Sequence, residues 1–283
     1  MKIKILSDST CDLSQALLDK YDVAITPLSV HCGERVGADG TDITPEDIYA
    51  YVEQSGELPK TSAVNVFDYL EAFRHWVDQG YEVVHFSISA DFSSTYQNAC
   101  LAAKELGSVY VVDSRNLSTG QGLLVLRAAE LAKEGLSAQE LAERCRAMTD
   151  QVEASFIIDR LDYLYKGGRC SALSAFGANL LRIKPCIEVR AGKMLPTKKY
   201  RGPLDKVLLQ YVEDRLSGRE NLDLRRIFIT HTACEPGLVE AVEEKIRALV
   251  PGFEEILETT AGATVTSHCG PNTLGILFMT KAQ

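Results

Sequence analysis

Short apolar runs alternate with amphipathic segments through the first half of the chain. Residues 3–6, 82–88 and 109–113 have the length and β-branched content of buried strands. Residues 66–77 and 95–106 instead repeat apolar side chains at helical spacing. Because strands and helices alternate, the pattern predicts a parallel sheet covered by helices on both faces, a three-layer α/β/α arrangement.

The predicted helices of this half begin at good capping residues. Asn65 is a favourable N-cap, with Val64 and Tyr69 at the two positions of a hydrophobic staple. Ser137 and Glu140 have the spacing of a capping box, which predicts a further helix that ends near residue 152. These caps predict where the helices start.

After residue 152 the pattern changes to hairpins mixed with long helices. Residues 187–198 predict a hairpin that turns at Ala191-Gly192. Helices are expected at residues 171–181, 204–216 and 237–250. This mixture predicts a smaller, two-layer α/β domain with a mixed sheet, so we expect two domains, residues 1–152 and 153–283.

Polar loops follow several of the predicted strands. Asp8-Ser9-Thr10, residues 89–95 and residues 114–122 each follow one, and Thr61-Ser62 precedes a helix that leads into another. Carboxyl ends of parallel strands share one edge of the sheet, where ligands bind, so we expect these loops to converge. Hydroxyls at a helix start favour an anion. The loops have too few basic residues for a polyphosphate, so a carboxylate fits best.

Five residues are candidate ligands for such a head group: Thr61, Ser62, Ser93, His268 and Gly270. Each hydroxyl has a structural alternative as a helix cap or a loop hydrogen bond. His268, in the polar loop of residues 267–271, is either a structural histidine or a donor to the head group. Gly270 would let the backbone approach a ligand closely.

Two compact basic loops lie in the second half, Lys166-Gly167-Gly168-Arg169 and residues 198–202. Basic clusters are usually solvated surface. In a chain this acidic, Lys166, Arg169 and Arg201 are also candidates for contact with a phosphate-bearing partner.

Charge and composition exclude several classes of function. The chain has 283 residues, a formal net charge of −9 and a pI near 5.2, so nucleic acid and anionic membranes are poor partners. No apolar run approaches the length of a membrane span, and the first residues lack a signal peptide. We therefore expect a cytoplasmic protein without stable membrane insertion.

The cysteines and histidines are too scattered for a metal site or a disulfide framework. Eight cysteines lie far apart, and only His31 and Cys32 offer adjacent ligands. We expect no bound metal and mostly reduced, buried cysteines.

An enzymatic alternative uses Asp8, Asp12, Ser93 and His268 in a hydrolase or phosphoryl-transfer enzyme. The sequence around Ser93 lacks the G-x-S-x-G nucleophile motif, and the chain has no phosphate loop of the G-x-x-x-x-G-K-[ST] type. A regulatory module for another small carboxylate is a third possibility.

Taken together, these loops resemble the DegV family, which includes the fatty-acid-binding subunit of bacterial fatty acid kinase. The matching segments run nearly end to end: residues 8–13, 60–62, 92–97, 113–122, 164–169, 183–185 and 268–275. Each segment is weak alone, and the specificity comes from their order along the whole chain.

The resemblance implies a DegV-like, two-domain α/β fold with one long-chain fatty acid in a tunnel between the domains. It implies that Thr61, Ser62 and Ser93 hydrogen-bond the carboxylate, with His268 and Gly270 at the same place. It implies no cofactor and no catalytic residues.

By the same resemblance, the chain is a carrier subunit. It would present the fatty acid to the catalytic subunit of fatty acid kinase, an ATP-dependent partner that forms an acyl phosphate. Lys166, Arg169 and Arg201 are then expected to contact that kinase or the transferred phosphoryl group.

The chain departs from the family pattern near both head-group loops. Ala63-Val64 and Ser94 replace residues that are common in the family, as does Cys269 beside His268. No departure removes a proposed hydroxyl donor, so the shape of the head-group pocket is what they would change.

Overall fold

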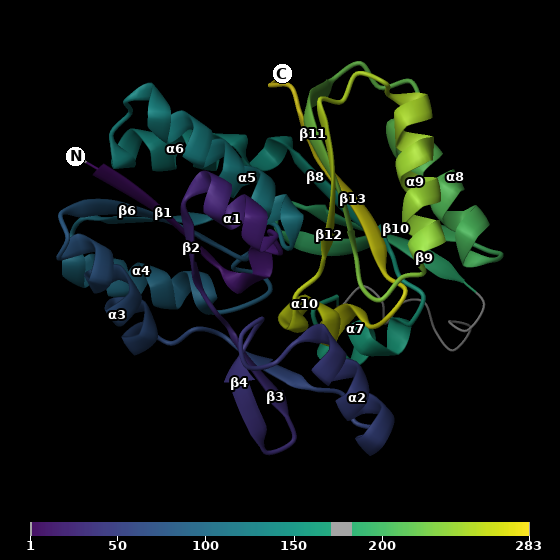
Figure 1. The fold of residues 1–283 in the computed structure, drawn as a ribbon, viewed down its shortest axis with the longest axis horizontal. Coiled ribbons are helices and arrows are strands. Elements are labelled where there is room, and N and C mark those ends of the chain that lie inside the picture. The colour runs from purple at the N-terminus through teal and green to yellow at the C-terminus, as the bar shows by residue number, and fades with distance from the viewer. Residues whose placement is uncertain (1, 171–182, 283) are drawn as a thin grey trace.

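A computed structural model describes residues 2–170 and 183–282 (Figure 1). The helix expected over residues 171–181 lies outside the described residues. Within them the strands form a four-stranded parallel sheet, a six-stranded mixed sheet and a small three-stranded sheet. The predicted combination of a parallel and a separate mixed sheet is therefore confirmed.

The parallel sheet has the strand order β2-β1-β6-β7. Its strands are β1 (Lys2–Asp8), β2 (Val23–Thr26), β6 (Tyr81–Ser87) and β7 (Val109–Asp113). Its helices are α1 (Gln15–Tyr21), α3 (Val66–Val77), α4 (Thr95–Leu106), α5 (Thr119–Leu131) and α6 (Ala138–Met148). As Figure 1 shows, α3 and α4 cover one face while α5 and α6 cover the other.

Alternation along the strands explains the continuous apolar runs. Val83 packs into the cluster formed with α3 and α4, whereas its neighbour Val84 packs into the cluster formed with α5 and α6. Both side chains are fully buried. A strand covered on both faces needs apolar residues at successive positions, as these strands have.

The small sheet lies at the end of the parallel sheet where the polar loops emerge. It has the order β4-β3-β5, with β3 (Ser29–Cys32), β4 (Arg35–Ala38) and β5 (Lys60–Ser62). Helix α2 (Pro45–Ser55) connects β4 to β5 and lies beside this sheet in Figure 1. The prediction of a loop at residues 60–62 was wrong, because antiparallel pairing with β3 makes this polar segment a strand.

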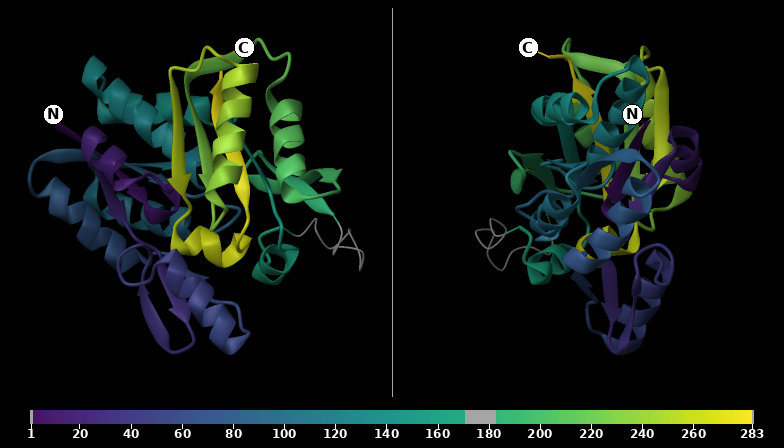
Figure 2. Two further views of the ribbon diagram at one scale, coloured as in Figure 1. Left: turned by 45° about the vertical axis from the view of Figure 1, so that its right-hand side comes forward. Right: turned by 90° about the vertical axis from the view of Figure 1, so that its left-hand side faces the viewer.

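The mixed sheet has the order β10-β9-β8-β13-β11-β12. Its strands are β8 (Val152–Ile157), β9 (Lys184–Arg190), β10 (Lys193–Tyr200), β11 (Leu222–His231), β12 (Glu255–Thr260) and β13 (Leu274–Thr280). Helices α8 (Leu204–Leu216) and α9 (Pro236–Leu249) cover one face, as Figure 2 shows. The predicted hairpin at Ala191-Gly192 is confirmed as the β9–β10 turn, where both residues have positive φ.

Helix α5 lies between the two large sheets. Its leucines share one buried cluster with Val84 of the parallel sheet and with Phe156 and Phe228 of the mixed sheet. Eleven of its thirteen residues are buried, so it has no solvated face. Strand β8 begins at Val152, but the shared cluster crosses that point, and the domain boundary at residue 152 stays a prediction.

Two short helices were not predicted. Helix α7 spans Leu161–Gly167, and α10 spans Ala263–Cys269, which includes part of the expected loop at 267–271. The α10 segment is rich in β-branched and hydroxyl residues, which disfavour helix. Its helical form therefore depends on tertiary contacts, and α10 contacts α7 and α2.

Candidate functional site

A small, mostly apolar cavity lies where α10, β5 and the loop after β6 meet. Its volume is about 50 Å³. The polar residues of its lining are Thr61, Ser62, Ser93, Arg169, Thr264 and His268, and the apolar ones include Leu28, Phe92, Met194 and Val265. The structure thus brings together four of the five predicted head-group residues from distant parts of the chain.

The hydroxyl of Thr61 reaches the imidazole of His268. Thr61 Oγ1 and His268 Nε2 are 2.8 Å apart, within hydrogen-bond distance. Thr61 lies on β5 and His268 in the last turn of α10, so this contact joins residues 207 positions apart in sequence. The pair forms one polar corner of the cavity.

The side chains of Thr61 and Ser62 point to opposite faces of β5. Successive side chains of a strand point to opposite faces, so Thr61 shares the face of its partner Val30, and Ser62 shares that of Ser29. Ser62 is exposed, and its Oγ lies 2.8 Å from His31 Nε2. The predicted head-group pair therefore does not present both hydroxyls from the same face of β5.

Ser93 lies half-buried in the loop that precedes α4. Its Oγ accepts a hydrogen bond from Thr95 N at 3.2 Å and lies 2.5 Å from Thr95 Oγ1. The N-cap of α4 is Ser94, whose side chain makes no capping hydrogen bond. Ser93 thus ties the loop to the first turn of α4 while it lines the cavity.

His268 is held in its neutral form by its surroundings. Burial and, to a smaller extent, the positive charge of the nearby Arg169 guanidinium together lower its pKa to about 4. The described part of the chain gives Nδ1 no hydrogen-bond partner. A Cβ built on Gly167 would lie 2.5 Å from this atom, so the glycine allows α7 to approach the imidazole.

Of the three basic residues predicted to contact a partner, Arg169 lines the cavity, whereas Lys166 and Arg201 do not. Arg169 lines the cavity and donates from Nη1 to Gly167 O at 2.7 Å and from Nε to Phe92 O at 3.4 Å. Lys166 and Arg201 are exposed and do not line it. Among the described residues, Arg169, although also exposed, is the one cationic side chain that lines this cavity.

Gly270 does not line this cavity. It has a φ of +69°, and an added Cβ would lie 2.7 Å from Tyr163 Cδ2. Its carbonyl accepts a hydrogen bond from Thr232 Oγ1 at 2.6 Å. A glycine is required here by the close packing against Tyr163.

A second apolar cavity adjoins the first. It measures about 30 Å³ and shares Leu117, Val265 and Cys269 with the first cavity, while Phe156 and Leu277 lie on its far side. Pockets that bury small ligands usually measure about 300–1,000 Å³. The two cavities share three lining residues and so form one apolar path that, at these volumes, is smaller than a typical ligand pocket.

Asp8 and Asp12 do not line the cavity with Ser93 and His268. Burial raises the pKa of Asp8 to about 6, although Asp8 accepts hydrogen bonds from Ile88 N and Gln121 Nε2 at 2.8 and 2.9 Å. Burial raises the pKa of Asp12 to about 8. Both carboxyl groups are engaged by their own chain, which disfavours the four-residue catalytic arrangement.

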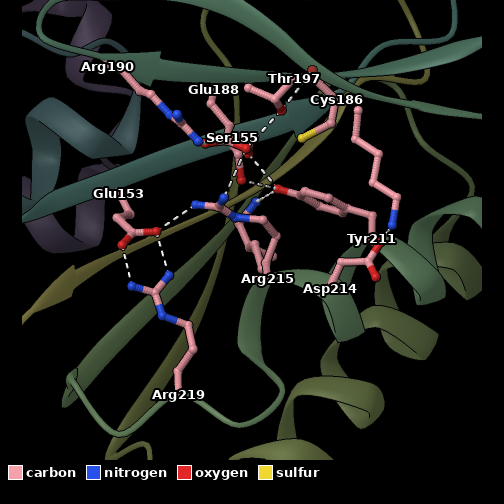
Figure 3. A network of polar contacts seen from close by, with 12 residues as sticks. Glu153, Ser155, Cys186, Glu188, Arg190, Thr197, Tyr211, Asp214, Arg215 and Arg219 are labelled. Atoms are coloured by element: carbon pink, nitrogen blue, oxygen red, sulfur yellow. Dashed lines mark hydrogen bonds and ion pairs between the residues drawn. The ribbon is translucent and has the colours of Figure 1, made fainter.

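A larger, polar cavity of about 440 Å³ lies beside β8, β9 and α8. Glu153 binds Arg215 and Arg219, and Arg215 also pairs with Glu188 at 3.1 Å, as Figure 3 shows. Arg190 pairs with Glu188 too, at 2.6 Å. These arginines already have carboxylate partners, so this network fastens α8 to the sheet rather than offering free cations.

No metal site was found in the part of the chain that the structure describes. Among residues 2–170 and 183–282, no group of three or more His, Cys, Asp or Glu side chains is placed to hold an ion. The adjacent His31 and Cys32 therefore gain no third ligand there, and His31 instead contacts Ser62.

The fold and the cavity define a class of α/β proteins in which an apolar cavity with a polar end lies between two sheets. The family model for uncharacterised proteins of the DegV family matches residues 2–281. The chain belongs to the DegV family, as the resemblance of its motifs indicated.

Relatives in sequence and structure cover nearly the whole chain. A fatty acid-binding protein of Thermotoga maritima is 33% identical over 97% of this chain and 96% of its own. A DegV family protein from Thermus thermophilus, solved for its fatty acid binding, superposes with a TM-score of 0.86 at 31% identity, covering 99% of this chain and all (100%) of that one. A stearic acid-binding protein from Eubacterium ventriosum gives 0.82 at 28% identity, with 99% of each chain covered.

Sequence reasoning missed how three residues serve the site. Arg169 was expected at a partner surface, yet it lines the cavity. His31 was weighed only as a metal ligand, yet it contacts Ser62. Met194 lines the cavity from the start of β10. The Gly-Gly pair before Arg169 was the only local signal, because it permits a sharp turn after α7.

Proposed function

We propose that this protein binds one long-chain fatty acid along the path formed by the two apolar cavities, with its carboxylate among Thr61, Ser62, Ser93 and His268. The observation that carries the proposal is an apolar path with a polar end, where the hydroxyls of Thr61, Ser62 and Ser93 lie with the His268 imidazole and the Arg169 guanidinium. The relatives described as fatty acid-binding proteins support it. Gly270 serves the site indirectly, through the turn that follows His268.

The energetics fit an amphipathic ligand. Each buried methylene contributes roughly 0.8 kcal/mol, so a long chain supplies a large gross gain before association costs. A carboxylate taken out of water needs several donors. The hydroxyls of Thr61, Ser62 and Ser93 and the Arg169 guanidinium line the cavity and can act as such donors.

The chain acts in this proposal as a carrier that presents the carboxylate to the catalytic subunit of an ATP-dependent fatty acid kinase, which forms the acyl phosphate. The exposed Lys166 and Arg201 and the cavity-lining Arg169 would contact the kinase or the transferred phosphoryl group. A carrier of this kind needs no nucleophile, metal or cofactor. The described residues include no helix long and apolar enough to span a bilayer.

Binding is tested by native mass spectrometry after incubation with oleic acid. We expect a one-to-one adduct with the unaltered chain. Thr61→Val and Ser93→Ala should each lower the affinity by about tenfold or more, because each removes a hydrogen bond to a charged group. Ser94→Ala is the matched control, since this neighbouring hydroxyl makes no capping bond and does not line the cavity.

A chain that never binds a long-chain acid would refute the proposal. Hydrolysis of esters or phosphate monoesters by the chain alone would instead support the enzyme that uses Asp8, Asp12, Ser93 and His268. Tight binding of a short carboxylate only would favour a regulatory module.

The role with a kinase is tested separately. With ATP and a fatty acid kinase catalytic subunit, Arg201→Ala should lower acyl-phosphate formation while oleic acid binding stays unchanged. Arg169→Ala should lower both, because Arg169 lines the cavity. Full acyl-phosphate formation by both variants would show that the basic loops do not serve this step.

A further inference from the structure

The geometry points to Asp12 and Asp39 as positioning residues of the binding site: together they fix α10, and through it His268, against the N-terminal half of the chain. This inference rests on the proposed function and adds that the two aspartates limit how fast the bound fatty acid enters and leaves. Neither aspartate lines the cavity.

Each carboxylate of the pair accepts one backbone N–H where α10 begins. Asp12 Oδ1 accepts from Gly262 N at 2.9 Å, and Asp39 Oδ1 accepts from Ala263 N at 2.8 Å. These contacts join residues 250 and 224 positions apart. They satisfy backbone donors that have no partner inside the helix.

The second oxygen of each carboxylate is held by a serine. Ser118 donates to Asp12 Oδ2 at 2.5 Å, and Ser9 donates to Asp39 Oδ2 at 2.8 Å. Both aspartates are buried, so water does not compete for these bonds. Each of the two carboxyl groups is thus held both by a serine of the N-terminal half and by a backbone N–H at the start of α10.

Gly262 fits between the two carboxylates. A Cβ built on it would lie 3.1 Å from Asp12 Oδ1 and 3.2 Å from Asp39 Oδ1. These distances are tighter than ordinary contacts, so an alanine at residue 262 requires the two carboxyl groups or the start of α10 to shift by a few tenths of an ångström. The close fit indicates that the contact is specific to this arrangement of the two halves.

Helix α10 is the element through which the contact reaches the ligand. It contributes Thr264, Val265, His268 and Cys269 to the cavity lining. Val265 and Cys269 also line the adjoining cavity, so α10 borders the whole apolar path. Because its sequence disfavours helix, its place depends on outside contacts.

The position of α10 affects how fast the fatty acid exchanges. The apolar path is smaller than a typical ligand pocket, and α10 borders it along both cavities. Release of α10 from the two aspartates would free the helix that borders this path in both cavities. Asp39 and Asp12 should therefore slow both entry and release of the fatty acid.

The experiment measures release of parinaric acid, a fluorescent fatty acid, from the full chain into excess oleic acid by stopped flow. Asp39→Ala should raise the release rate by about tenfold or more, since a buried charged acceptor is lost. Asp39→Asn should restore most of the slow release, because its amide oxygen still accepts from Ala263. Ser137→Ala is the matched control: it removes the N-cap of α6, which is remote from the cavity.

A second measurement does not use a ligand. Hydrogen exchange of the amides of residues 263–269 should become faster in Asp39→Ala and stay unchanged in Ser137→Ala. Gly262→Ala should also give faster release of parinaric acid and faster amide exchange. It replaces Asp39→Ala as the test variant if Asp39→Ala folds poorly.

The outcomes separate the two claims. Unchanged release and unchanged amide exchange in both Asp39→Ala and Gly262→Ala would overturn the positioning role while leaving fatty acid binding intact. A wild-type chain that binds no parinaric or oleic acid refutes the proposed function, whereas faster amide exchange in the variants would still support the control of α10.

Discussion

At the scale of single residues, the close approach of Gly167 to His268 leaves no room for a side chain at residue 167. The imidazole reaches Thr61 on one side, and the backbone of α7 lies against its other nitrogen. Any side chain at residue 167 must displace the ring. Gly167 was predicted only as part of a basic loop, because the histidine that it contacts is about a hundred residues away in sequence.

Gly167→Ala should weaken oleic acid binding by about tenfold, because displacing the His268 imidazole breaks roughly one hydrogen bond of the site. Titration by native mass spectrometry measures the affinity. Gly237→Ala is the matched control, since no heavy atom lies within 4 Å of its built Cβ. Equal affinity of the two variants would mean that the position of His268 does not affect the ligand.

At the scale of elements, Tyr211 shows how α8 is fixed to its sheet. Its hydroxyl donates to Ser155 O at 2.6 Å and accepts from Ile276 N at 3.0 Å (Figure 3). Ser155 and Ile276 are direct partners on β8 and β13. One helical side chain thus bridges two strands, a role that helical periodicity alone would assign to an ordinary core residue.

Tyr211→Phe should lower the free energy of unfolding by about 1–3 kcal/mol, because it removes the buried hydroxyl that bonds Ser155 O and Ile276 N. Urea unfolding measures the loss. Tyr200→Phe should cost less, since the Asp214 carboxylate that accepts from its hydroxyl keeps Lys198 as a partner. A larger loss at Tyr200 than at Tyr211 would contradict this explanation.

At the scale of the whole molecule, buried histidines tie stability to pH. Burial lowers the pKa of His85 to about 3, and His85 is fully buried against Tyr69 and Phe73. The unfolded chain takes up a proton at His85 below about pH 6.5, whereas the folded chain does not until about pH 3. The unfolded state therefore binds more protons in this window, and stability falls as the pH falls.

The stability advantage of wild type over His85→Leu should shrink as the pH is lowered from about 6.5 to 4, by up to about 1.4 kcal/mol per pH unit. Urea unfolding at several pH values measures this difference. Because Asp8, Asp12 and His268 are present in both proteins, their own titrations cancel. An advantage that is constant or grows as the pH falls would contradict a neutral His85 in the folded state.

The sequence by itself determined the regular parts of this protein. Period-two and period-3.6 patterns are local, so the parallel sheet, the β9–β10 hairpin and the helix caps at Asn65 and Ser137 could be predicted from neighbouring residues. The motifs also identified the family.

Only the tertiary structure decided what depends on contacts across hundreds of residues. Strand β5 forms because β3 pairs with it, and α10 forms although its residues disfavour helix. The meeting of Thr61 with His268, the place of Arg169 in the cavity and the two aspartates at α10 follow from the packing of the sheets. A local pattern holds no information about such distant partners, because their proximity arises from the packing of the whole chain.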